Sequence, residues 1–122
     1  MGRRSRQRAG GRPAKLEAPS TEYRSPDGGA TLTLRGVLTP RTRTQYAEVL
    51  YGNTLSQEDA WQRGVEFLFE RLVVGWEVSG VPTEGQGDLL LRLRAATPGE
   101  RRWVRDVLRE HVGEHFPDVE AP

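Results

Sequence analysis

The stretch WQRGVEFLFERLVVGWEVSGVP, residues 61–82, decides the fold class, because its hydrophobic period changes near the middle. In its first half, large apolar residues recur at helical spacing: Trp61, Val65, Leu68 and Leu72. After Leu72 the apolar residues alternate as in a strand: Val74, Trp76 and Val78. The change predicts a helix followed at once by a strand, with a turn at residues 80–82.

The segment before this stretch, residues 21–38, predicts a β-hairpin. Pro26 fixes the backbone of its turn, and Gly28 and Gly29 accept positive φ angles. In residues 31–36 the apolar side chains alternate with polar ones, so that one face of the strand is apolar. This strand can pair with the strand that contains Trp76.

Two helices are predicted between these strands. Thr39 can cap free backbone amides, and Pro40 is tolerated at the first helical position, so a helix begins there and ends at Gly52. Ser56 and Asp59 resemble the capping box that opens the helix of residues 61–72.

The C-terminal third contains one ambiguous segment and one helix with clear signals. Residues 88–96 fit either a strand or a helix, and their leucine and alanine content favours the helix. Thr97 and Glu100 form a capping box, and the last helix is expected from about Pro98 to about His115.

The expected fold class is therefore α+β, with a small sheet of two or three antiparallel strands packed by three or four helices. Residues 21–117 form the single domain, and residues 118–122 follow Pro117 as a flexible tail. Residues 1–20 contain no aromatic or β-branched side chain, which predicts a disordered arm.

Positive charge is concentrated near the N-terminus. Residues 1–30 contain seven basic and three acidic residues, and the rest of the chain contains 11 basic and 14 acidic residues. Such an arm can bind nucleic acid by charge, which makes a nucleic-acid-associated accessory protein the alternative function. However, 17 of the 18 basic residues in the chain are arginine, so arginine richness is not confined to the arm. The arginines of the basic arm are Arg3, Arg4, Arg6, Arg8 and Arg12.

The composition argues against most catalytic classes. The chain has no cysteine, which excludes thiolate catalysis, disulfides and cysteine metal sites. No nucleophile, base and oxyanion site occur together, and Asp106 is expected to form surface ion pairs with Arg102 and Arg109. No apolar run approaches the roughly 18 residues that span a membrane. We therefore expect neither enzymatic activity nor a cofactor, and we expect no membrane association.

One pattern suggests an enzyme, since His111-x-x-Glu114-His115 matches the H-x-x-E-H signature of inverted zinc proteases. Two histidines at i, i+4 can share a zinc ion, and the glutamate can act as a general base. Those enzymes take a third ligand from a later helix, and little of this chain follows. Both histidines also fall within the apolar stripe of the last helix, so we expect them to face the core or a partner, without a metal.

Aromatic residues lie on two sides of the helix of residues 61–72, because Phe67 is about 100° away from the main apolar stripe. Such a helix either packs on two sides within its own domain or presents one side to a partner. We expect Trp61 and Trp76 inside and Phe67 at an interface. The candidate partner-binding residues are Trp61, Phe67, Phe69 and Trp76.

Together, TLTLRGVLTPRTRTQYAEVL (residues 31–50) and residues 61–82 resemble the tail assembly chaperones of long-tailed bacteriophages. In that family a strand leads through a Leu-Thr-type cap into a helix, and a second helix runs into a Val-Val-x-Trp stretch before a Gly/Pro turn. The matching residues here are Leu38-Thr39-Pro40, Leu72-Val73-Val74-Gly75-Trp76, Gly80 and Pro82.

The resemblance implies a non-enzymatic protein that binds the long helical tape measure protein, or other tail components, during tail assembly. It implies a location in the bacterial host cytoplasm, and it is compatible with a homo-oligomer. The basic arm and the last helix lie outside the segments that carry the resemblance.

Overall fold

Helix α2 (Gln57–Leu72) passes directly into strand β4 (Val73–Val78) in the computed structural model, which describes residues 19–51 and 57–122. The predicted change from helix to strand is confirmed, and it occurs without an intervening loop. The caps expected at Gly52 and Ser56 lie outside the described residues. So do residues 1–18, with all five arginines of the basic arm.

The described elements alternate between pairs of strands and pairs of helices. In chain order they are β2 (Ser20–Arg24), β3 (Ala30–Arg35), α1 (Pro40–Tyr51), α2, β4, β5 (Val81–Thr83), α3 (Gln86–Arg94) and α4 (Pro98–His115). The strands form one antiparallel sheet in the order β2-β3-β4-β5, which confirms the α+β class.

Two boundaries of the sheet differ from the prediction. The sheet has four strands, one more than the upper expectation, because β5 pairs with β4 where only a turn was expected. Residues 19 and 20, assigned to the arm, also belong to the fold. Ser20 pairs with Arg35, and the Pro19 carbonyl accepts a hydrogen bond from the amide of Gly36.

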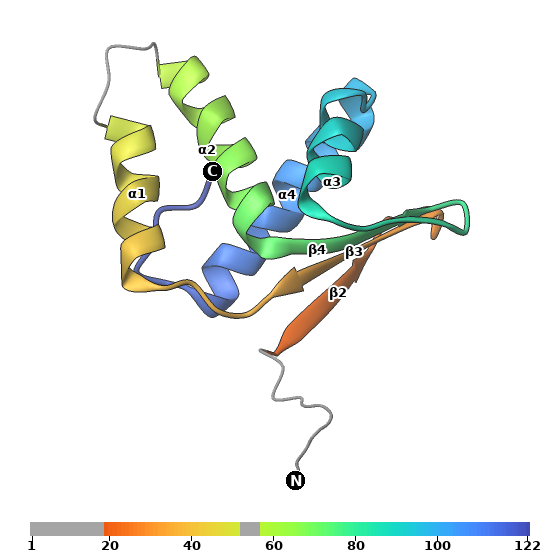
Figure 1. Ribbon diagram of the computed structural model, residues 1–122, viewed down its shortest axis with the longest axis horizontal. Coiled ribbons are helices and arrows are strands. Elements are labelled where there is room, and N and C mark those ends of the chain that lie inside the picture. Colours follow the sequence, from red (N-terminus) through yellow and green to blue (C-terminus); the bar gives the residue numbers. More distant parts are fainter. Residues whose placement is uncertain (1–18, 52–56) are drawn as a thin grey trace, which may run out of the picture.

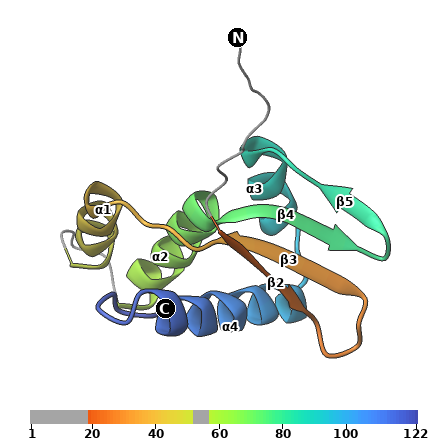
Figure 2. The same cartoon turned by 90° about the horizontal axis from the view of Figure 1, so that it is seen from below.

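The helices lie on one side of the sheet, so that the core fills the space between two layers (Figure 1). Leu32, Leu34 and Trp76 on the helix-facing side are at most 2% exposed. On the opposite side Thr33 is half-buried and Glu77 is exposed. Figure 2 shows the arrangement from below, with α1 at the end of the molecule that is distant from β5. Within residues 19–51 and 57–122, no helix combines the length and apolar character needed to cross a membrane.

Both expectations for the C-terminal helices are confirmed. The ambiguous segment forms α3, which buries Leu89 and Leu93. Helix α4 has the predicted bounds, and its capping box forms: Thr97 Oγ1 accepts from the Glu100 amide, and the Glu100 carboxylate accepts from the Thr97 amide.

Arg92 connects α3 with α4 and with β4. Its guanidinium carbon lies 4.7 Å from the ring centroid of Trp76, and its Nη2 donates to the Glu100 carboxylate at 2.6 Å. Hydrogen bonding from Arg92, together with the hydrogen bond from the Thr97 amide, lowers the pKa of Glu100 from its usual value. The Phe69 ring also packs against Trp76, edge-on at a centroid distance of 5.9 Å.

The segment after Pro117, expected to be a flexible tail, lies against α1. Asp118 forms an ion pair with Arg43, and the Glu120 carbonyl accepts a hydrogen bond from Tyr46 Oη at 2.8 Å. The Glu120 carboxylate accepts from Tyr51 Oη. Burial raises the pKa of Tyr46, so this phenol remains a hydrogen-bond donor at neutral pH. The prediction missed these contacts because a short polar segment carries no periodicity.

The turn between β4 and β5 contains two residues with positive φ, Ser79 at 52° and Gly80 at 80°. This combination defines a type I′ turn, whose twist matches that of the two strands it joins. Glycine adopts such angles freely, whereas the Cβ of serine makes them unfavourable. The Ser79 amide also donates to the Gly29 carbonyl at 2.8 Å, which connects this turn with the turn of the β2–β3 hairpin.

We predict that Ser79→Asn raises the free energy of unfolding by about 0.5–1 kcal/mol, because Asn tolerates positive φ and Asn-Gly is the preferred pair in this turn. Chemical denaturation measures the change. Gly80→Ala is the matched variant and should lower stability, since φ is also positive there. If Ser79→Asn proved no more stable than the wild type, the turn would carry no strain at this residue.

Candidate binding groove

The four aromatic residues predicted to bind a partner do not form one surface. Phe69 and Trp76 are 1% and 2% exposed and belong to the core, so they cannot contact a partner while the domain is folded. The assignment of these two residues as partner-binding residues is therefore corrected, although Trp76 is inside as expected. The physical reason is that α2, with Phe69, packs on two sides within its own domain, against α1 and against β4 and α3. Trp76 is buried because it lies on the helix-facing side of the sheet.

Trp61 and Phe67 are both half-buried. The Phe67 ring stacks on Tyr46 with centroids 6.2 Å apart, and the Arg71 guanidinium lies 4.7 Å from the centroid of Phe67. Trp61 borders a hollow of about 300 Å³ between α1 and α2, which Tyr51 also lines. These two aromatics retain exposed ring surface, but each is already partly covered by its own domain.

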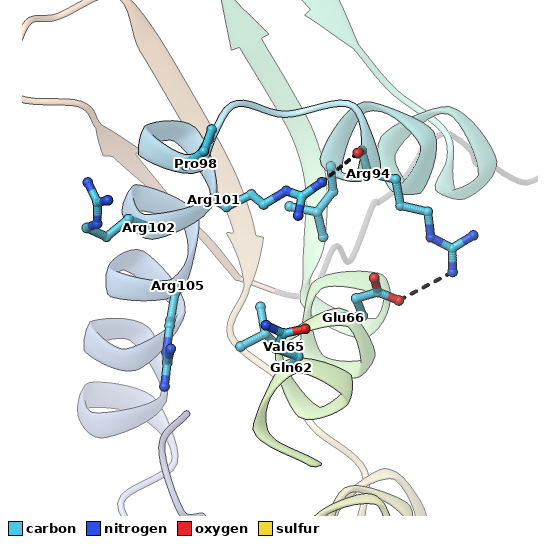
Figure 3. A pocket seen from close by; sticks show the side chains of 9 residues that line it. Gln62, Val65, Glu66, Arg94, Pro98, Arg101, Arg102 and Arg105 are labelled. Carbon is cyan, nitrogen blue, oxygen red and sulfur yellow. Dashed lines mark hydrogen bonds and ion pairs between the residues drawn. The ribbon is translucent and has the colours of Figure 1, made fainter. Parts of the chain in front are cut away.

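A larger hollow lies between α2, α3 and α4 and is shown in Figure 3. Its volume is about 370 Å³. Its apolar floor consists of Val65 from α2, Leu93 from α3 and Pro98 from α4. Because four arginines surround this floor, we name the hollow the arginine groove. The arginines are Arg94, Arg101, Arg102 and Arg105.

Two of these arginines have partners within the protein. Arg94 forms an ion pair with Glu66 of α2 at 3.3 Å, and Arg101 donates to the Arg94 carbonyl at 2.7 Å (Figure 3). The carbonyl is a neutral acceptor, so it fixes the Arg101 guanidinium without compensating its charge. The first turn of α4 is thereby joined to the end of α3, which shapes the groove.

The other two arginines have no hydrogen-bond or ion-pair partner in residues 19–51 and 57–122. Arg102 is exposed, and the Nε of Arg105 is buried without an acceptor. Of the two predicted ion pairs of Asp106, the one with Arg109 forms, at 3.8 Å, and the one with Arg102 does not. The sequence signal for this groove was the spacing of Arg101, Arg102 and Arg105, which places them on neighbouring parts of one helix surface. The sequence alone did not predict the groove, because its floor is made from three separate elements.

His111, the first histidine of the protease-like pattern, is fully buried, as expected. Its Nε2 lies 2.6 Å from the Arg35 carbonyl oxygen, which can only accept, so Nε2 carries the proton. Its Nδ1 then accepts from Tyr23 Oη at 2.8 Å. The pKa of Tyr23 is raised to about 12, chiefly by burial and further by Glu114 and Glu110, so that the phenol remains a donor. One imidazole thus joins α4 to both strands of the hairpin.

This geometry gives the histidine pattern a structural role. Both ring nitrogens of His111 are occupied by protein groups, so neither is available to a metal. His115 lies at the edge of the core with a side chain 34% exposed, and its ring centroid is 4.4 Å from that of His111. Across residues 19–51 and 57–122, no cluster of three His, Cys, Asp or Glu side chains has a geometry that could hold a metal ion.

Comparisons of the chain with protein-family models, with curated proteins and with solved structures find no match. The chemistry of the arginine groove therefore carries the functional argument.

We predict that His111→Leu lowers the free energy of unfolding by about 1–3 kcal/mol, because the Arg35 carbonyl and the Tyr23 hydroxyl lose their buried partner. Thermal or chemical unfolding measures this change. Unchanged stability would show that the two hydrogen bonds make no net contribution to the free energy of unfolding.

The same residue should make stability depend on pH. Burial lowers the pKa of His111 below its usual value of 6.5, so the unfolded chain binds this proton more readily than the folded chain. Its contribution is therefore complete above pH 6.5 and declines as the pH falls toward the lower folded-state pKa. Unfolding measured at about pH 7.5 and about pH 5 should show a smaller decline in His111→Leu than in the wild type. His115→Leu is the matched control and should retain most of the decline due to His111, because burial, the largest cause of the lowered pKa of His111, remains.

We also predict that zinc does not stabilise the protein, because the two nitrogens of His111 are engaged. Metal analysis of the purified protein and unfolding with and without added zinc would check this. If the wild type contained zinc at a near-stoichiometric level and both His111→Leu and His115→Leu lost it, the structural role assigned to the two histidines would be contradicted.

Proposed function

We propose that the protein is a non-enzymatic binding protein, and that it acts as a tail assembly chaperone of a long-tailed bacteriophage. In this role it binds the helical tape measure protein, or another tail component, in the cytoplasm of the bacterial host. The observation that carries the proposal is the arginine groove. Three helices frame an open groove with an apolar floor and unpaired guanidinium groups, which is suitable chemistry for holding a segment of another protein.

The order of elements also supports this family. The two segments that resemble tail assembly chaperones form β3 with α1 and α2 with β4. Leu38, in the Leu-Thr-type cap, is 7% exposed and belongs to the core, so the cap that begins α1 also anchors it. Trp61 and Phe67 offer exposed ring surface on α2, where a partner that lies along this helix would find aromatic contacts.

Co-expression with a tape measure protein from the same genome tests the proposal. We expect the two proteins to co-purify, because the chaperone covers helical surface that is otherwise exposed before the tail tube forms. An unrelated helical protein of similar net charge is the control and should not co-purify. A well-folded product that binds no tail protein would contradict the proposed function.

The same preparation distinguishes the alternative, a nucleic-acid-associated protein that acts through Arg3, Arg4, Arg6, Arg8 and Arg12. The charge imbalance of residues 1–30 favours this alternative. A variant without residues 1–18 removes these arginines and leaves Pro19 and strand β2 in place. Salt-sensitive DNA binding that disappears in this variant would support the alternative, and tail-protein binding that persists in it would support the proposal.

A further inference from the structure

The arginine groove is positively charged on a domain that is otherwise acidic. Residues 31–122 contain 11 basic and 14 acidic residues, so an average patch of this surface has a slight negative charge. The groove instead contains four arginines and one carboxylate, that of Glu66. Because Glu66 is already paired with Arg94, the remaining positive charge has no compensating group in the groove. This local excess favours an anionic occupant.

Arg105 gives a second indication. Its Nε is withdrawn from water and has no acceptor within residues 19–51 and 57–122. Because protein atoms cover Nε, a ligand reaches this side chain through its two terminal nitrogens, which are not buried and also have no acceptor in those residues. Arginine binds carboxylates through two parallel hydrogen bonds, and its two terminal nitrogens can supply both donors.

The spacing of the arginines along α4 fits a helix. Arg101 and Arg105 are four residues apart, which corresponds to about 6 Å along the helix axis at 1.5 Å per residue. Carboxylates at i and i+4 of a partner helix have the same separation. Such a helix, lying along α4, can place one carboxylate near each of these two arginines.

The apolar floor of the arginine groove favours a protein over a nucleic acid as its occupant. Val65, Leu93 and Pro98 present apolar surface between the arginines. An amphipathic helix can cover this surface with an aliphatic side chain, whereas a phosphate backbone has no apolar group to place there.

We propose that the arginine groove binds an acidic amphipathic helix of a partner protein. Glutamates or aspartates of that helix pair with Arg101, Arg102 and Arg105, and one of its aliphatic side chains contacts the floor. This inference rests on the proposed function, since it specifies the chemistry of the tail-protein segment that the chaperone holds.

Binding of labelled peptides to the full chain, followed by fluorescence anisotropy, tests the inference. The probe is a helical peptide of about 20 residues with leucines at i, i+3, i+4 and i+7 and glutamates at i, i+4 along their flank. The matched peptide has glutamine in place of each glutamate. We expect the acidic peptide to bind about tenfold more tightly than its glutamine counterpart at about 0.1 M salt, because charge-assisted hydrogen bonds are the stronger ones.

Two double variants of equal net charge locate the binding. Arg102→Gln/Arg105→Gln removes the two arginines that have no partner, and it should abolish the tenfold preference for the acidic peptide. Arg24→Gln/Arg41→Gln removes two exposed arginines on β2 and α1, outside the groove, and should retain the preference. Equal binding of both peptides, or the same loss in both double variants, would overturn the inference.

Two further measurements address other occupants. If a short DNA duplex binds the wild type, loses affinity in Arg102→Gln/Arg105→Gln and competes with the peptide, the groove is a nucleic-acid site and the inference is wrong. If the wild type is a dimer that the groove variant converts to a monomer, the occupant is a second copy of this chain, which also overturns it. Unchanged co-purification of the tail protein with the groove variant would overturn this inference alone. Peptide binding through the groove without any tail-protein binding would overturn the proposed function alone.

Discussion

The direct passage of α2 into β4 is the constraint on which the rest of the fold depends. With no loop between Leu72 and Val73, the direction of the helix fixes the direction of the strand. Strands β3 and β5 flank β4, and helices α1, α3 and α4 pack against α2. Among the described elements, only β2 contacts neither α2 nor β4 directly and is attached through β3. The buried His111 also joins β2 to α4 through Tyr23. The unit α2–β4 therefore organises both layers.

The elements with strong periodicity could be predicted from the sequence, and short segments without periodicity could not. Helix α4 has both a capping box and a regular apolar stripe, and its bounds were predicted correctly. Strand β5 has only three residues, so no alternation can develop in it, and its existence depends on the type I′ turn at Ser79 and Gly80. The C-terminal segment is held by Tyr46 and Arg43, which lie more than 70 residues earlier in the chain. Such pairings have no local signal.

The arginine groove shows that binding sites, like short segments, are difficult to predict from sequence alone. Aromatic residues dominate many interfaces, which makes them candidates for binding, but a small domain also needs them to fill its core. Phe69 and Trp76 serve that purpose. Arginine is abundant throughout the sequence, and only the packing of α3 beside α2 and α4 places Arg94, Arg101 and Arg105 around one apolar floor. A cluster drawn from three elements becomes recognisable once their packing is known.

Pro82 has a consequence for the behaviour of the sheet in a crowded cell. In a hairpin with a two-residue turn, Val78 and Val81 form the hydrogen-bonded pair next to the turn, so the nitrogen of the following residue points away from β4. At Pro82 that nitrogen has no hydrogen, and the outer edge of β5 offers no donor at its centre to the strand of another molecule. This residue therefore protects the β5 edge of the sheet against edge-to-edge aggregation without removing a hydrogen bond from the sheet.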